Sequence, residues 1–225
     1  MQTNVFSSHR LLEMYNSLVV LDEHVLPLTT RNISDMHNNV FGGAILKRGN
    51  RTDKNDGDIV VATGTNKYRS NPLYHGEIVA LNAFFEMTDG IPANPDDYYF
   101  VASHQPCLMC MAALYWAGFK DVYYVFDYDE TASLFFMPDD RQMVNEFTDN
   151  MLNTQNKMIN MMKIGNELSQ NVAVCDEELY NNIMFLECAV KNEEVRQKYI
   201  NLAPSIISNI LYKDAVDRCE EVTTH

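Results

Sequence analysis

The chain carries His75-Gly76-Glu77 and, about thirty residues later, Pro106-Cys107-Leu108-Met109-Cys110. One imidazole and two thiolates are good zinc ligands, and three protein ligands leave the fourth zinc position open for water. An open position is typical of a catalytic site and not of a closed structural one. Glu77 stands two residues from His75, so its carboxylate is expected near the metal without binding it.

Both stretches are predicted to open helices. His75 begins one apolar helical segment, and Pro106 occupies a favourable start position for a helix over 107–117. Cys107 and Cys110 share one face of the first turn, where exposed N–H groups and the helix dipole stabilise a thiolate. Helices that leave the same edge of a sheet bring their N-termini together, so we expect one site.

The rest of the chain predicts an α/β fold. Strands that alternate with helices imply parallel crossovers in one sheet covered by helices. Beyond Pro138 the chain is predicted to be mostly helical, with one short strand at 171–174. The predicted helices are 9–26 (ended by Pro27), the one that begins at His75, 107–117, 140–163, 175–191 and 205–218, and the earlier strands are 40–46, 59–62, 98–102 and 122–126.

Composition places the chain among globular proteins of the cell interior. Its 225 residues are 46% hydrophobic, enough for one large domain or for a domain with an extension. We find no signal-peptide pattern and no apolar run long enough to span a bilayer, so we expect a cytoplasmic protein. In a reducing compartment a C-x-x-C pair favours metal binding or redox chemistry over a structural disulfide.

The charge argues against a polyanionic partner. Lys and Arg number 17 against 31 Asp and Glu, which gives a formal net charge of −14. Binding to nucleic acid usually requires a basic surface, and a field of this sign repels polyanions. We therefore expect a small-molecule partner, with neither nucleic acid nor membrane.

Two other readings of the cysteines stay open at this point. A thioredoxin-like redox pair leaves His75 and Glu77 unexplained. A closed structural zinc site needs a fourth ligand, for which His104 is the nearest candidate. Its position before Cys107 instead predicts that His104 ends a strand and faces the pocket or a dimer contact.

The chain resembles the cytidine deaminase-like superfamily, whose signature is H-x-E followed by P-C-x-x-C. Its closest resemblance is to bacterial guanine deaminases and to other nucleobase and tRNA-adenosine deaminases. The likeness runs from about Leu11 to Asp129. The helix 107–117 with its Tyr-Trp-Ala ending and the stretch Phe41-Gly42-Gly43-Ala44 resemble guanine deaminases. His75-Gly76-Glu77, where many members have Ala for Gly76, is similar to fungal cytosine deaminases. The resemblance implies a three-layer α/β/α fold with a mixed five-stranded sheet, and a homodimer.

The resemblance also implies roles for the motif residues. His75, Cys107 and Cys110 would hold Zn²⁺, and Glu77 would shuttle the proton while zinc-bound hydroxide attacks an amidine carbon and ammonia leaves. Asn66 would read the base, with a turn-forming asparagine as the alternative. The other substrate-binding candidates are Phe41, Ala44, Gly76 and Trp116, together with an acidic residue after strand 122–126 that is Asp129 or Glu130, with Asp127 also near.

The sequence therefore predicts hydrolytic deamination of a free nucleobase, with guanine-like purines favoured. The alternatives are a tRNA-adenosine deaminase, a cytosine or nucleoside deaminase, and a non-catalytic binding module with the same fold. Gln105 stands where relatives usually carry glutamate, which leaves the exact base open. Residues 1–191 are expected to form the deaminase-like domain, with a helical insertion at 139–170, and residues 192–225 a helical extension.

Overall fold

The computed structural model describes residues 8–36, 38–50, 57–87, 94–146, 159–171 and 179–208. Five strands form one mixed sheet in the order β2-β1-β3-β4-β5. β1 runs antiparallel to β2 and β3, whereas β3, β4 and β5 are parallel. The predicted five-stranded α/β fold is thus confirmed. The strands are β1 (Gly42–Lys47), β2 (Ile59–Thr65), β3 (Tyr98–His104), β4 (Asp121–Phe126) and β5 (Asn160–Lys163).

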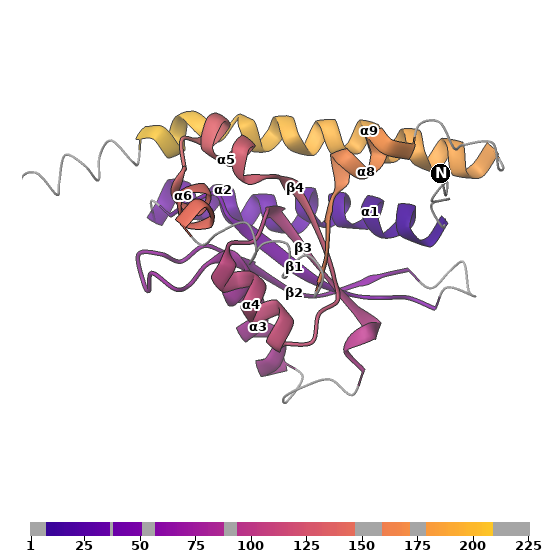
Figure 1. Ribbon diagram of the computed structural model, residues 1–225, viewed down its shortest axis with the longest axis horizontal. Helices are drawn as coiled ribbons and strands as arrows, with labels where there is room; N and C mark the ends of the chain where they lie inside the picture. The colour runs from indigo at the N-terminus through magenta and orange to yellow at the C-terminus, as the bar shows by residue number, and fades with distance from the viewer. Residues whose placement is uncertain are drawn as a thin grey trace, which may run out of the picture.

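Helices cover both faces of the sheet (Figure 1). α3 (Gly76–Met87) and α4 (Leu108–Trp116) lie on one face, and α1 (Ser8–Val20) and α9 (Leu179–Ile200) lie on the other. Side chains of β3 alternate between the two resulting cores, because successive residues of a strand point to opposite faces. Tyr99 and Val101 join the core beneath α1 and α9, and Phe100 and Ala102 join the core over α3 and α4.

The predicted helix end at Pro27 is wrong. After α1 the chain continues through a π-helical segment, η1 (Leu21–Val25), into α2 (Leu26–Met36). The N–H of Leu26 bonds to the carbonyl of Leu21, five residues back. Pro27, which has no N–H to donate, follows this π-helical segment, and prolines and π-bulges are both sites at which a helix departs from regular i to i−4 bonding.

The segment after β4 also differs from the prediction. It contains α5 (Tyr128–Phe135), α6 (Asp139–Glu146), the strand β5 and α8 (Ile164–Asn171). Residues 160–163 belong to the predicted helix 140–163, but pairing with β4 makes them a strand. Of the predicted strand 171–174, Asn171 ends α8 and the other three lie outside the described residues.

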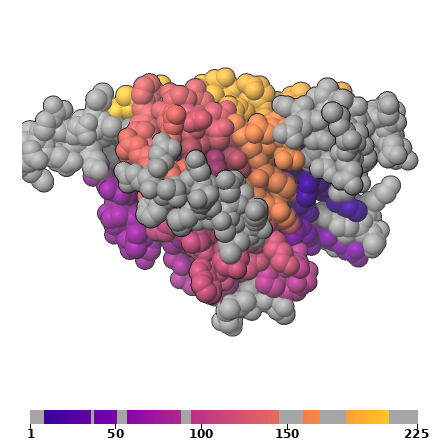
Figure 2. All heavy atoms as spheres, in the orientation of Figure 1, coloured from indigo at the N-terminus to yellow at the C-terminus, as the bar shows by residue number. Residues whose placement is uncertain are grey.

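α9 runs beside α8 along one side of the molecule (Figures 1 and 2). The predicted domain boundary between residues 191 and 192 falls inside this continuous helix. The division into two parts stays a prediction. Of the predicted helix 205–218, residues 205–208 are helical and the remainder lies outside the described residues. No described helix has the length and apolar character needed to cross a membrane.

Candidate metal centre and active site

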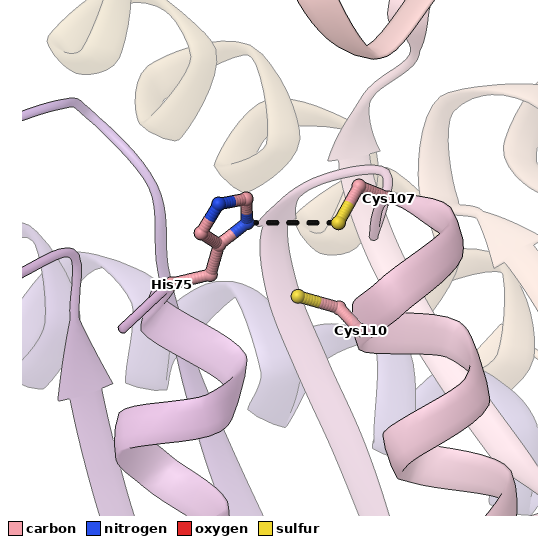
Figure 3. Close-up of side chains that lie close together, drawn as sticks. All are labelled: His75, Cys107 and Cys110. Atoms are coloured by element: carbon pink, nitrogen blue, oxygen red, sulfur yellow. Dashed lines mark hydrogen bonds between the residues drawn. The ribbon is translucent and has the colours of Figure 1, made fainter. Parts of the chain in front are cut away.

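His75, Cys107 and Cys110 meet at the N-termini of α3 and α4 (Figure 3). Each offers one ligand atom, and these atoms lie within 4.8 Å of one another. The Nδ1 atom of His75 is 3.6 Å from Sγ of Cys107, so this ring nitrogen faces the thiols. The predicted ligand set is therefore assembled at one place, with Cys107 and Cys110 buried and His75 half-buried.

The local structure explains why Cys107 faces this point. Cys107 is the N-cap of α4, with extended backbone dihedrals, and its carbonyl accepts the helical N–H of Met111. The carbonyl oxygen of the preceding residue, Pro106, accepts a hydrogen bond from the hydroxyl of Tyr128 at 2.6 Å. The turn that presents the first thiol is thus tied both to its own helix and to α5.

The electrostatics of the site are those of a thiolate–imidazolium pair between Cys107 and His75. Hydrogen bonding from Cys110 lowers the pKa of Cys107 to about 4 against the effect of burial, and His75 adds to the lowering. The hydrogen bond with Cys107 raises the pKa of His75 to about 9, again against burial. Two sulfurs and one imidazole nitrogen match the preference of zinc, so the residues present fit this ion.

A closed four-ligand site does not form among the residues that the structure describes, because no fourth His, Cys, Asp or Glu joins this group. His104, the candidate for that role, lies elsewhere, in a cage of aromatic rings. The arrangement therefore matches an open, three-ligand zinc site.

Glu77, beside this centre, and Asn66, directly after β2, each carry one buried polar atom without a hydrogen-bond partner among the described residues. Glu77 is 4% exposed, and its Oε2 has no hydrogen-bond partner among the described residues. Burial and the charge of Cys107 raise its pKa to about 7. In Asn66, Oδ1 accepts the N–H of Tyr68 at 3.0 Å, which leaves the buried Nδ2 without a partner in the described part of the chain. Buried polar atoms are normally bonded, so both are candidates for substrate contact.

Residues 33–126 match the family described as "Cytidine and deoxycytidylate deaminase zinc-binding region". This part of the chain is a cytidine/deoxycytidylate deaminase-like domain. Its zinc-binding region contains the His75, Cys107 and Cys110 cluster.

Two curated relatives support the same family at modest identity. Guanine deaminase of Bacillus subtilis (strain 168) is 31% identical over 97 residues, and tRNA-specific adenosine deaminase of Rickettsia felis is 31% identical over 88 residues. The matches cover 43% and 39% of this chain and 56% of each relative. The chain therefore spans little more than half the length of these relatives.

A solved structure, that of NE0047 in complex with 2,6-diaminopurine, superposes with a TM-score of 0.50 at 18% identity. The similarity covers 84% of this chain and 92% of that one. At this identity it supports the fold alone.

The other predicted substrate residues are only partly brought to the metal centre of the deaminase-like domain. The ring of Phe41 lies parallel to that of His75, with centroids 6.4 Å apart. Ala44 is fully buried in the core beneath α1 and α9, and Gly76 packs against β1. Trp116 is 84% exposed at the far end of α4, about 13 Å along the helix from Cys107.

The predicted acidic residues are engaged elsewhere. Asp129 is exposed and forms an ion pair with Arg141 at 3.1 Å. Glu130 is bound by Lys163 and by Arg196, at 2.8 and 2.7 Å. Asp127 also pairs with Lys163. These ion pairs make a structural role the simpler account of all three carboxylates.

A different carboxylate, that of Asp140 at the start of α6, lies near the metal centre. Burial raises the pKa of Asp140 to about 6, and the charge of Cys107 acts in the same direction while that of His75 opposes it. The sequence prediction missed this residue. Its only local signal is Pro138-Asp139-Asp140, an acidic helix start, which does not reveal which site the helix covers.

Packing at Gly76 leads to a first prediction. A Cβ at Gly76 would stand 2.7 Å from Cα of Gly42 and 2.9 Å from the carbonyl oxygen of Phe41. Both are backbone atoms, so relieving these contacts would require a shift of the backbone. We expect Gly76→Ala to lower the free energy of unfolding by about 1–3 kcal/mol and to weaken zinc binding by displacing His75. Thermal melting and chelator competition measure the two effects.

Gly57→Ala is the matched control, because a Cβ at Gly57 meets nothing within 4 Å. Equal melting temperatures for both variants would contradict the packing argument.

The buried imidazole of His104 is expected to make the stability of the fold sensitive to acid. Burial lowers the pKa of His104 from 6.5 to about 3, and the charge of Arg196 acts in the same direction. Between pH 6.5 and 3 the unfolded chain binds more protons than the folded chain, so the free energy of unfolding should decrease as the pH falls, by about 5 kcal/mol at most. The contribution is fully present above pH 6.5 and is lost as the pH falls toward 3.

Metal-free His104→Phe should have a shallower pH dependence of unfolding between pH 6.5 and 4 than metal-free wild type. Carboxyl groups with lowered pKa values also make the free energy of unfolding decrease as the pH falls, and they do so equally in both proteins. The difference in slope between the variant and wild type therefore isolates His104. These carboxyl groups are Asp22, Asp127 and Glu130. Exposed His9→Gln is the control. Identical slopes in His104→Phe and wild type would refute the argument.

Proposed function

We propose that this chain is a zinc-dependent hydrolytic deaminase of a free nucleobase, with a guanine-like purine as the favoured substrate. The observation that carries the proposal is the cluster of three metal ligands beside Glu77, whose buried Oε2 has no hydrogen-bond partner among the described residues. The buried Nδ2 of Asn66, which also has no partner there, supports it. The similarity to guanine deaminase of Bacillus subtilis supports a nucleobase as the substrate. The net charge of −14 supports a small neutral substrate over a polyanionic one. A homodimer and a cytoplasmic location belong to the same proposal.

In this mechanism His75, Cys107 and Cys110 would hold the zinc, which when bound would supply a water activated for attack near neutral pH. Glu77 accepts a first proton at Oε2 from the attacking water and delivers it to the ring nitrogen. It then accepts the second proton of the same water and delivers it to the departing amine, which leaves as ammonia. A carboxyl pKa raised by burial suits both directions of transfer, because it lies close to neutral pH.

Asn66 holds the base by donating from Nδ2 to an acceptor on its edge. The Oδ1 atom already accepts the N–H of Tyr68, so the amide is fixed with its donor side available. Asp140 supplies a second carboxyl group near the metal centre, where it can hold a proton for the leaving group.

Ammonia release from zinc-loaded protein across free bases, nucleosides and nucleotides tests the proposal. Guanine or a close analogue should be turned over fastest, with zinc content near one ion for each chain. If no member of the panel releases ammonia, the small-molecule proposal fails and a non-catalytic module is favoured.

A tRNA-adenosine deaminase is the second candidate function. One loop next to His75 favours it, because Lys67 and Arg69 are exposed there beside two exposed tyrosines, Tyr68 and Tyr74. No ion pair joins Lys67 or Arg69 to another residue that the structure describes. Basic and aromatic side chains together suit single-stranded nucleic acid. Inosine formation in tRNA that falls steeply with salt, without release of ammonia from guanine, would favour this candidate.

A further inference from the structure

The hydroxyl of Ser103, at the end of β3, bridges three groups. It lies 3.1 Å from the N–H nitrogen of Gly42, 3.1 Å from the carbonyl oxygen of Gly42 and 2.9 Å from Nδ1 of His104. Ser103 is 0% exposed, and His104 is 2% exposed. A single buried hydroxyl thus joins the ends of β1 and β3.

Counting hydrogens fixes the direction of these bonds. A serine hydroxyl has one hydrogen to donate and two lone pairs to accept with. Donation to the carbonyl of Gly42, with acceptance from the Gly42 N–H and from Nδ1–H of His104, satisfies all three contacts. Donation to His104 would instead leave the Gly42 carbonyl without this bond. The hydrogen-bond pattern that satisfies all three contacts thus assigns the imidazole hydrogen to Nδ1 and directs the Ser103 hydroxyl toward Gly42.

The segment Phe41-Gly42 touches both parts of the candidate site. The ring of Phe41 lies parallel to that of His75, with an interplanar angle of 12°. The carbonyl of Phe41 accepts the N–H of Asn66 at 2.9 Å. Whatever fixes Phe41-Gly42 therefore fixes a metal ligand on one side and the predicted base-reading amide on the other.

We infer that Ser103, oriented by His104, is a positioning residue that holds His75 and Asn66 in place through Phe41-Gly42. It touches neither the metal nor the substrate. The effect on His75 depends only on the metal centre, whereas the effect on Asn66 rests on the proposed function. Groups that orient a metal ligand from outside the coordination sphere typically change metal affinity 10–100-fold.

The test compares Ser103→Ala with Ser103→Thr and with Ser17→Ala in the full chain. Ser17 is the matched control, because it is also 0% exposed and its hydroxyl donates to a backbone carbonyl, that of Glu13 at 2.7 Å. Zinc affinity is measured by chelator competition, and the geometry of the centre by the visible spectrum of the Co²⁺-loaded protein.

Ser103→Ala should bind zinc about 10–100-fold more weakly and shift the Co²⁺ spectrum. Ser103→Thr, which keeps the hydroxyl, should restore both readouts, and Ser17→Ala should lower the melting temperature with zinc affinity unchanged. The inference is overturned if Ser103→Ala binds zinc within twofold of wild type, or if Ser17→Ala loses as much affinity.

Phe41→Leu keeps the inference testable if Ser103→Ala does not fold. This variant removes the ring beside His75 and leaves the backbone groups of Gly42 available to Ser103. It should weaken zinc binding in the same range, and unchanged affinity would overturn the inference. If wild type releases no ammonia from any base but Ser103→Ala still binds zinc more weakly, the proposed function fails while the role of Ser103 toward His75 stands.

Discussion

Glu77→Gln is expected to keep its zinc and to lose about 10³–10⁴-fold in kcat on the substrate identified by ammonia release. The amide has nearly the size and shape of the carboxylate, so the fold and the three metal ligands should be preserved. It can neither accept a proton from water nor deliver one to the leaving amine. Proton transfer by a positioned side chain contributes about 10²–10⁴-fold, and here one group serves both transfers.

Metal content and ammonia release, measured on the same preparation, separate a loss of proton transfer from a loss of zinc. Glu86→Gln is the matched control, because Glu86 is exposed on the same helix, α3, and should retain normal turnover. Normal turnover in Glu77→Gln would remove Glu77 from the mechanism. Loss of zinc together with activity would instead assign Glu77 a role in metal binding.

The metal centre was predictable because its chemistry is encoded locally. Cys107 and Cys110 stand one helical turn apart, and their helix start was marked by Pro106. His75 and Glu77 also lie at a helix start, that of α3. The distance between this pair and the two cysteines is set by how α3 and α4 leave the same edge of the sheet. Local helix rules thus place each pair at a helix start, and the topology of the sheet brings the two starts together.

The parts that were missed depend on contacts between distant segments. Methionines 161 and 162 carry a weak strand preference, and only pairing with β4 makes residues 160–163 a strand. Asp140 comes near the metal centre because α6 packs on α5, which no local pattern predicts. Asp129 and Glu130 had the expected position in the sequence, but Arg141, Lys163 and Arg196 neutralise them.

The second half of α9 bears directly on the predicted domain boundary. Tyr199 is 0% exposed and packs against Phe126 and His104, with ring centroids 6.1 and 6.0 Å away. Arg196 donates to the carbonyl of Val125 at 3.1 Å and lies over the ring of Phe126 at 4.5 Å. These contacts attach residues after 191 to the end of β4, which is the edge of the sheet that carries the metal centre.

A chain that ends at residue 191 is therefore expected not to fold. It would lose the buried side chains of Val195, Tyr199 and Ile206, each of which contributes about 1.5–3 kcal/mol of burial. It would also expose Phe126 and the core beneath α9. The sum, roughly 5–10 kcal/mol, is comparable to the whole stability of an ordinary domain, about 5–15 kcal/mol.

A matched pair of valines on α9 tests the same packing without truncation. Val195 is 0% exposed and Val190 is 60% exposed, so the two differ in burial and not in residue type. We expect Val195→Ala to lower the free energy of unfolding by about 2 kcal/mol and Val190→Ala to change it by less than about 0.5 kcal/mol. Chemical denaturation measures both. Equal effects in the two variants, together with a folded 1–191 chain, would show that the deaminase-like domain ends where the sequence predicted and that α9 beyond it is dispensable.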